Sequence, residues 1–263
     1  MAVAEQKKYH VNRRKVGGVA LGLLLVLLIL FFMMRKKSSN VKEIVVDITH
    51  LSDGESDFIK DKDIQLIIKR AFEADLSLSK VGAVDVKRVE AVLETDPFVE
   101  NAEAYIDAGS NLNIKITQRE PILRVIDNNG LNYYLDKSGI RMPLSKYFSA
   151  RVPIVTGAVP PHVNDFLLRK KYGLKDVFLL VQRLNADPFF APMVQQIVMD
   201  ASGEFTLIPI LGDQKIRLGT LDDLDEKLER LKTFYKEAMP YEGWKTYRSI
   251  SVKYKNQIVC KKK

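Results

Sequence analysis

Histidine, cysteine and clustered carboxylates are the residue types in this chain that could support catalysis or metal binding. The sequence has three histidines, His10, His50 and His162, and a single cysteine, Cys260. These residues are scattered, and the chain contains no HExxH, GxSxG, GxxxxGKS/T or CxxC pattern, each of which would place reacting groups at a workable spacing. We therefore expect no catalytic residue, no metal and no cofactor. An enzyme whose site is assembled from distant residues, and a reactive thiol at Cys260, are the alternatives.

The densest group of carboxylates lies between residues 222 and 226, where four acidic side chains could surround a cation. The same residues open a helical repeat of apolar side chains that includes Leu228, Leu231 and Tyr235. Negative charge is favoured at a helix N-terminus because it complements the helix dipole. We interpret these carboxylates as the start of a helix.

Charge also gathers beside a proline in Gln118, Arg119, Glu120 and Pro121. No histidine, cysteine or second carboxylate is near in sequence, so this group lacks the partners that catalysis needs. Proline cannot donate to a central sheet ladder and belongs at an edge or a junction. We predict a domain junction at these four residues; a solvated turn is the alternative.

The positive charge of the chain is concentrated in its first 37 residues. The formal net charge is +8, but residues 1–37 alone carry eight Lys or Arg against one Glu. The remaining residues are almost neutral, with 33 basic and 32 acidic side chains. A basic patch is the electrostatic footprint of nucleic-acid binding, and this distribution removes the main support for that function.

The run Val16–Met34 contains neither a charged residue nor a proline. At ~1.5 Å per residue, a helix of this length spans roughly 28 Å, close to the hydrocarbon thickness of a bilayer. We predict a transmembrane helix over residues 16–34, a cytoplasmic tail over 1–15 and a linker over 35–40. A cleaved signal peptide is the alternative. Lys and Arg flank the span in nearly equal number on its two sides, so charge does not fix the orientation.

Hydrophobic periodicity predicts an α+β body in two parts. Residues 41–120 read as a strand, a helix with Ile64 and Ile68 inward, a second helix ending at Asp96-Pro97, and two strands, which gives a β-α-α-β-β order. Residues 121–263 read as a β-rich domain with helices, one of which places Val177, Leu180, Val181 and Leu184 on one face. Its first hairpin turns at Asn129-Gly130, and its last strand is expected over residues 249–259.

Six short segments resemble motifs of the FtsQ/DivIB family of bacterial cell division proteins. They are similar, in order, to the family patterns PWV..A, V.ER.P, YLD..G, LP.L.G, v.LG and vDLRY. The segments are Asp96–Ala102, Ile116–Pro121, Tyr134–Asp136 with Gly139, Val152–Gly157, Arg217–Gly219 and Ile250–Tyr254. The resemblance covers residues 13 to 261 and implies that residues 41–120 form a POTRA domain.

The resemblance implies a non-enzymatic, bitopic membrane scaffold of the bacterial divisome. Such a scaffold binds FtsB-like and FtsL-like partners and regulates septal peptidoglycan synthesis, with no nucleic acid or small-molecule substrate. The implied location is the inner (plasma) membrane at the division septum, with a cytoplasmic N-terminus and a periplasmic or extracytoplasmic body. The alternatives are a POTRA-containing envelope assembly factor and a membrane-tethered cell-wall enzyme.

The resemblance also implies a partner-binding site on the last strand and the helix that precedes it, and a partner would add a strand of its own to the last strand. An unpaired strand edge offers backbone donors and acceptors for such pairing. We expect Ile250, Val252 and Tyr254 to face the core of the domain; Tyr254 is the first choice for a partner contact, and an ordinary core aromatic is the alternative. The expected site comprises Lys253, Tyr254, Asn256, Gln257, Ile258 and Val259.

Overall fold

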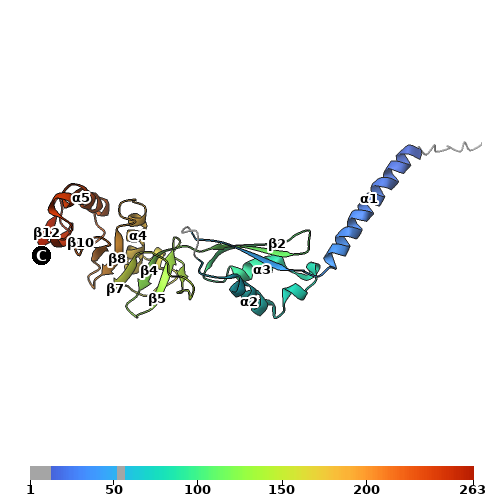
Figure 1. Cartoon of the computed structure of the whole chain (residues 1–263), viewed down its shortest axis with the longest axis horizontal. Coiled ribbons are helices and arrows are strands. Elements are labelled where there is room, and N and C mark those ends of the chain that lie inside the picture. The colour runs from blue at the N-terminus through green and yellow to red at the C-terminus, as the bar shows by residue number, and fades with distance from the viewer. Residues whose placement is uncertain (1–12, 52–56) are drawn as a thin grey trace, which may run out of the picture. The chain divides into compact units, whose positions relative to one another are not determined.

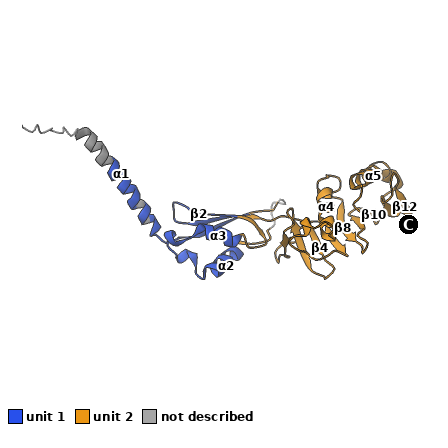
Figure 2. Ribbon diagram, turned by 180° about the vertical axis from the view of Figure 1, so that it is seen from behind, with its two compact units in different colours: residues 1–48, 61–93, 102–116 blue, residues 49–60, 94–101, 117–263 orange. Residues whose placement is uncertain are grey.

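The computed structural model describes residues 13–51 and 57–263, which fall into two compact units (Figures 1 and 2). Of the described residues, 13–48, 61–93 and 102–116 form the first unit, and 49–51, 57–60, 94–101 and 117–263 form the second. Three segments of the predicted 41–120 domain, namely 49–60, 94–101 and 117–120, therefore cluster with the second unit. The predicted boundary at residue 120 stays a prediction.

Helix α1 (Arg13–Lys37) precedes the folded part of the first unit. Within the residues that the structure describes, no helix is both long and apolar enough to cross a membrane. Residues 1–12 of the expected cytoplasmic tail lie outside the described residues. The span at Val16–Met34 stays a prediction.

The first unit has the predicted β-α-α-β-β order. Its elements are β1 (Ile44–Thr49), α2 (Asp61–Phe72), α3 (Val86–Leu93), β2 (Val99–Ile106) and β3 (Leu112–Gln118), with 3-10 turns η1 (Leu76–Leu78) and η2 (Val81–Ala83) between the helices. The sheet order is β1-β3-β2. Ile64 and Ile68 on α2 are buried, as are Ile114 and Ile116 on the central strand. The helical periodicity therefore indicated the buried face of α2 correctly.

The second unit is built on a mixed sheet of nine strands in the order β12-β11-β10-β9-β8-β7-β4-β5-β6. The strands are β4 (Pro121–Ile126), β5 (Asn132–Asp136), β6 (Arg141–Met142), β7 (Ile154–Gly157), β8 (Val194–Met199), β9 (Phe205–Pro209), β10 (Lys215–Gly219), β11 (Tyr247–Ser251) and β12 (Val259–Lys262). The pairs β4–β7, β7–β8 and β10–β11 are parallel, and the others are antiparallel.

Helices and a tight turn complete this unit. The helical elements are η3 (Phe166–Leu168), α4 (Gly173–Asn185), α5 (Leu224–Glu237) and α6 (Met239–Glu242). The predicted apolar stripe of α4 is buried in the same cluster as Leu228, Leu231 and Tyr235 of α5. The predicted hairpin between β4 and β5 is confirmed, because Gly130 has a φ of 81° and Asp127 Oδ1 accepts hydrogen bonds from the N–H groups of Asn129 and Leu131.

Candidate functional site

The described histidines lie in separate surroundings. His50 Nδ1 is 3.0 Å from Asp57 Oδ1, whereas His162 Nε2 is 3.2 Å from the carbonyl oxygen of Gly139. His10 lies outside the described residues. Among residues 13–51 and 57–263, no three histidine, cysteine or carboxylate side chains are grouped as a metal ion would require. The expectation that the protein is not an enzyme stays a prediction.

Cys260 lies on β12 and is partly buried. Burial raises the pKa of its thiol, and the negative charge of Glu242 adds to that effect. A raised pKa lowers the fraction of thiolate, which is the reactive form. The surroundings of Cys260 therefore disfavour a reactive thiol, despite the neighbouring lysines.

The acidic residues 222–226 lie at the start of α5, as interpreted from the sequence. Asp225 and Glu226 are in its first turn, and Asp225 Oδ1 is 2.5 Å from Arg183 Nε. Asp223 is the N-cap residue with a φ of 51°, but its side chain makes no capping hydrogen bond; its Oδ2 lies 3.6 Å from Lys255 Nζ. Basic side chains therefore neutralise part of this cluster.

The predicted junction residues Gln118 and Arg119 form a dense hydrogen-bond network within the second unit. Gln118 is buried: its Oε1 accepts from the N–H of Phe58 at 2.7 Å, and its Nε2 donates to the Thr49 carbonyl and to Asp57 Oδ1 at 3.1 and 2.7 Å. A buried amide with both ends satisfied is a structural feature rather than a reactive one.

Arg119 is the centre of this network. Its guanidinium donates to the carbonyl oxygens of Pro97 and Val99 at 3.2 and 2.8 Å and to Asp136 Oδ2 at 2.7 Å. The Asp136 side chain is 1% exposed, and its Oδ1 accepts from the N–H groups of Ser138 and Ile140, both at 2.8 Å. Arg119 therefore joins the segment before β2 to the turn that follows β5.

Glu120 and Pro121 complete the predicted junction. Glu120 is exposed, and Pro121 is the first residue of β4, opposite Asp136 on β5. The first position of a strand tolerates proline because its missing N–H removes no bond from the middle of the ladder. β4 itself lies between β7 and β5, so Pro121 begins a central strand and not an edge strand.

The prediction of one continuous strand over residues 249–259 is wrong. β11 ends at Ser251, the chain turns, and β12 begins at Val259 and returns antiparallel to β11. The turn contains Asn256 in the left-handed region with a φ of 54°. Asparagine tolerates this conformation better than most residues, which explains how the chain reverses without a glycine or proline.

This reversal changes the position of every predicted contact residue. Lys253, Tyr254, Asn256, Gln257 and Ile258 lie in the connection, and only Val259 lies on a strand. Because Ile258 precedes β12, it takes part in none of the β11–β12 residue pairs. The sheet edge nevertheless belongs to the chain's last strand, β12.

Tyr254 does not face the core. Ile250 and Val252 are fully buried, whereas the Tyr254 side chain is 51% exposed. The strand ends before Tyr254, so the alternation of faces does not reach it. The alternative of an ordinary core aromatic is therefore wrong, and Tyr254 is accessible to a partner.

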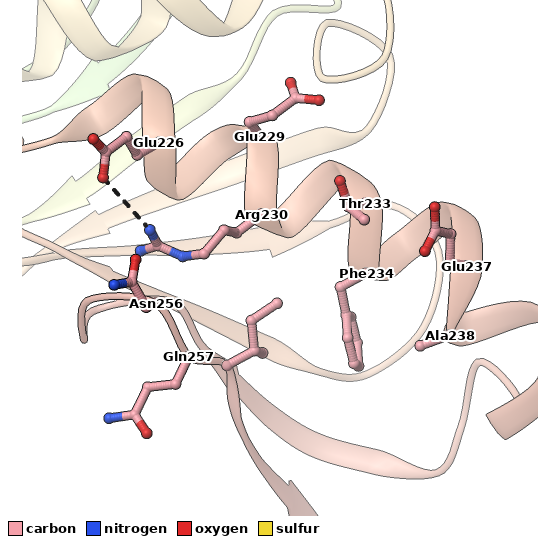
Figure 3. A pocket seen from close by; sticks show the side chains of 10 residues that line it. Glu226, Glu229, Arg230, Thr233, Phe234, Glu237, Ala238, Asn256 and Gln257 are labelled. Atoms are coloured by element: carbon pink, nitrogen blue, oxygen red, sulfur yellow. Dashed lines mark ion pairs between the residues drawn. The ribbon is translucent and has the colours of Figure 1, made fainter.

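Arg230 on α5 fixes the connection. Its Nη2 donates to the carbonyl oxygens of Val252 and Tyr254, both at 3.2 Å, and its Nη1 is 3.8 Å from Glu226 Oε2. Figure 3 shows Arg230 and Phe234 extending from α5 toward the segment that carries Asn256 and Gln257. One side chain therefore binds two carbonyls of the chain just after β11.

An open groove of about 710 Å³ lies between α5 and this connection (Figure 3). Phe234 and Ile258 supply apolar surface, and three carboxylates line it, from Glu226, Glu229 and Glu237. The groove thus brings three of the predicted contact residues, Asn256, Gln257 and Ile258, against a face of α5.

The resemblance indicated the helix before the last strand, but reasoning from the sequence named none of the groove residues of α5. Glu226, Arg230, Thr233 and Glu237 follow one another at spacings of three or four, so they share a helix face. That face lies beside the buried stripe of Leu228, Leu231 and Tyr235. Its residues are mostly polar, so the sequence does not distinguish it from an ordinary solvent-exposed helix face. Only the position of the connection makes it one wall of a groove.

The matched family models cover both units of the chain. A model described as FtsQ/DivIB, C-terminal related, matches residues 120–261, and a model of a POTRA-like domain matches residues 41–117. The chain is 28% identical over 181 residues to the cell division protein FtsQ of Geobacter sp. strain M21, and 30% identical over 170 residues to that of Rhodothermus marinus. These matches confirm the resemblance that the motifs indicated.

The two alignments cover 68% and 63% of this chain. They cover 64% and 61% of the relatives, so the chain spans less than two thirds of the length of the curated relatives that it matches.

Proposed function

This chain belongs to the FtsQ/DivIB family, and from that membership we propose that it is a non-enzymatic scaffold of the bacterial division machinery. It binds FtsB-like and FtsL-like partners by strand addition and thereby regulates septal peptidoglycan synthesis. The relatives named above are cell division proteins, which supports the general role. The observation that supports strand addition is the position of β12 at one edge of a nine-stranded sheet.

β12 is better suited to strand addition than the opposite edge of the sheet. The opposite edge strand, β6, has two residues, whereas β12 has four. A very short edge strand offers few backbone groups to a partner and is one way in which proteins protect sheet edges. Lysines also protect edges, and β12 carries Lys261 and Lys262. On β12 we assign these lysines to selecting an acidic partner strand.

The backbone donors available on β12 follow from its register. The N–H of Lys263 donates to the carbonyl oxygen of Thr246, on the β11 side. Successive N–H groups of a strand point to opposite sides, so the N–H groups of Val259 and Lys261 also face β11. Those of Cys260 and Lys262 face away from β11, toward an incoming strand.

The groove beside α5 supplies the side-chain contacts that backbone pairing alone lacks. A ladder hydrogen bond contributes only about 0.5–1.5 kcal/mol net, so affinity requires further contacts. The groove presents the apolar groups of Phe234 and Ile258 and the carboxylates of Glu226, Glu229 and Glu237. A partner segment that follows its paired strand into this groove would carry apolar and basic side chains.

Cross-linking in dividing cells tests this placement. A photoreactive amino acid at Val259 should capture an FtsB-like partner, because this side chain is 42% exposed on β12. The matched control is Leu179 on α4, which is 44% exposed and lies on no sheet edge. Mass spectrometry identifies the captured protein. Capture from Leu179 alone would contradict partner binding at β12.

We also propose that residues 16–34 anchor the scaffold in the inner membrane at the septum, with residues 1–15 in the cytoplasm. The uncharged run Val16–Met34 supports the span. The orientation rests on the membership of the FtsQ/DivIB family, because the flanking charges are nearly balanced. Protease added to spheroplasts should digest the two folded units, because in the proposed orientation they lie on the extracytoplasmic side of the membrane. Immunoblotting against the C-terminus follows the digestion, and full protection of the folded part in sealed spheroplasts would reverse the orientation.

A further inference from the structure

A second, smaller pocket in the second unit has a different chemical character from the groove beside α5. It has a volume of about 350 Å³ and lies between the β5–β6 turn and the segment leading into η3. Ser138, Arg141, His162 and Asn164 provide its polar lining, and Ile140 and Phe166 provide apolar surface. No carboxylate belongs to this lining, so the pocket offers hydrogen-bond donors and positive charge without a neutralising acid.

The hydrogen bond of His162 determines which of its ring nitrogens is available. Nε2 lies 3.2 Å from the Gly139 carbonyl oxygen, which can only accept, so Nε2 carries a hydrogen. The neutral ring therefore has its lone pair on Nδ1, and a second proton would add to Nδ1. A proton there makes both nitrogens donors and gives the ring a positive charge.

The ring of His162 is held from two sides by aromatic residues. Its centroid lies 5.4 Å from that of Phe166 and 6.2 Å from that of Tyr133, both in edge-to-face arrangements. The Gly139 carbonyl is fixed in turn, because Asp136 accepts from the N–H groups on both sides of it, at Ser138 and Ile140. His162 is thus positioned before any ligand arrives.

Arg141 is the permanent cation of the pocket. Its guanidinium carbon lies 5.9 Å from the centre of the Tyr133 ring, and it forms no ion pair with any of the described residues. Arg169, which follows η3, is in contrast paired with Asp165 at 3.1 Å. A guanidinium presents a planar fork of donors that matches the two oxygens of a carboxylate.

We infer that this pocket binds a carboxylate group of a peptide, held by Arg141 and by His162 in its protonated form. The apolar surface of Ile140 and Phe166 accommodates a small apolar group next to that carboxylate. The carboxylate can belong to the C-terminus of the peptide or to an acidic side chain, because the two groups have the same chemistry.

Binding at this site is coupled to proton uptake. Partial burial lowers the pKa of His162, and the charge of Arg141 lowers it further, while the bond to Gly139 opposes this change. Arg141 and Tyr133 are the charged and titratable groups beside the ring, since η3 contributes the apolar Phe166. The free pocket therefore keeps His162 neutral near pH 7. A bound carboxylate stabilises the imidazolium and raises its pKa, so affinity increases as the pH falls.

Histidine NMR on the full chain tests the inference, because only three histidines contribute signals. The pKa of His162 is measured with N-acetylalanine and with N-acetylalaninamide, which differ only in the carboxylate. The His162→Gln variant identifies the resonance. N-acetylalanine should raise the pKa of His162 by about one unit, a typical effect of an opposite charge nearby. N-acetylalaninamide should leave it unchanged.

Two matched variants and one anion complete the test. Arg141→Gln should abolish the shift caused by N-acetylalanine, whereas Arg169→Gln should retain it, because Arg169 is already paired outside the pocket. No shift with N-acetylalanine, or equal shifts with the amide, would overturn the inference. An equal shift with inorganic phosphate would show a general anion site and would overturn the assignment to carboxylates.

Discussion

Replacing Arg119 with methionine should lower the free energy of unfolding of the second unit by about 3–5 kcal/mol, the usual cost of breaking a buried ion pair from one side. The side chains of Arg119 and Asp136 are 11% and 1% exposed, so water cannot replace the lost partner. The carbonyl oxygens of Pro97 and Val99 would lose their donors as well. A fall in melting temperature of about 10 °C corresponds to such a loss.

Thermal unfolding of the full chain, followed by near-ultraviolet circular dichroism, measures this effect. Lys137→Ala is the matched control, because Lys137 forms a neighbouring but exposed ion pair with Glu100 at 2.8 Å. An exposed pair contributes about 0–1 kcal/mol, so this variant should melt near the wild type. Equal melting temperatures for the two variants would contradict a structural role of Arg119.

A double substitution separates the buried charge from the lost hydrogen bonds. Asp136→Asn keeps a side-chain oxygen for the N–H groups of Ser138 and Ile140 but removes the negative charge. Combined with Arg119→Met, it should therefore restore part of the stability. If the double variant is no more stable than Arg119→Met alone, the unpaired charge of Asp136 is not the cause of the loss.

Lys262→Pro should weaken binding of the proposed FtsB-like partner at least about tenfold. Leaving an acceptor of the partner unpaired costs about 1–3 kcal/mol, and 1.4 kcal/mol is a factor of ten. The N–H of Lys262 faces away from β11, so its removal breaks no bond within this chain. The proline ring would also occupy the space of the incoming strand. Calorimetric titration of the full chain with the purified partner measures the change.

Lys262→Ala is the control, since it removes the charge and keeps the backbone donor. The only ion pair of Lys262 among the described residues is an exposed one, 3.6 Å from Glu242, so this variant should bind within a few-fold of the wild type and melt at the same temperature. Equal losses for the proline and alanine variants would assign the effect to charge instead of strand pairing. Unchanged binding by both would place the docking surface elsewhere.

The regular elements were predictable because their signals are local. The helical stripe of α4 and the Asn-Gly hairpin each depend on residues close in sequence, and both have the predicted form. The motif order likewise identified the family before any contact was known. Local periodicity thus determined which faces are buried in both units.

The chain reversal after β11 was not predictable in the same way. Residues 249–259 alternate in polarity well enough for a strand, and no glycine or proline marks a turn. What holds the reversal is Arg230, which binds the carbonyls of Val252 and Tyr254 from a helix that precedes β11 in the chain. A tertiary contact of this kind leaves no local pattern.

The junction shows the same limit. Proline and the absence of catalytic partners in sequence favoured a structural role for residues 118–121, but the carboxylate that Arg119 binds belongs to Asp136, beyond the whole of β4. The pairing depends on where β5 ends in space, and sequence spacing alone does not provide that position.

The strand order of the nine-stranded sheet has a consequence for how the second unit folds. Every neighbouring pair in the order joins consecutive strands except β4–β7. Pairing between consecutive strands closes shorter loops, which costs less chain entropy and favours rapid assembly. On the ribosome, each strand from β8 onward therefore finds its neighbour already synthesised. The unpaired edge therefore moves along the sheet as each new strand is added, and in this structure β12 forms that edge.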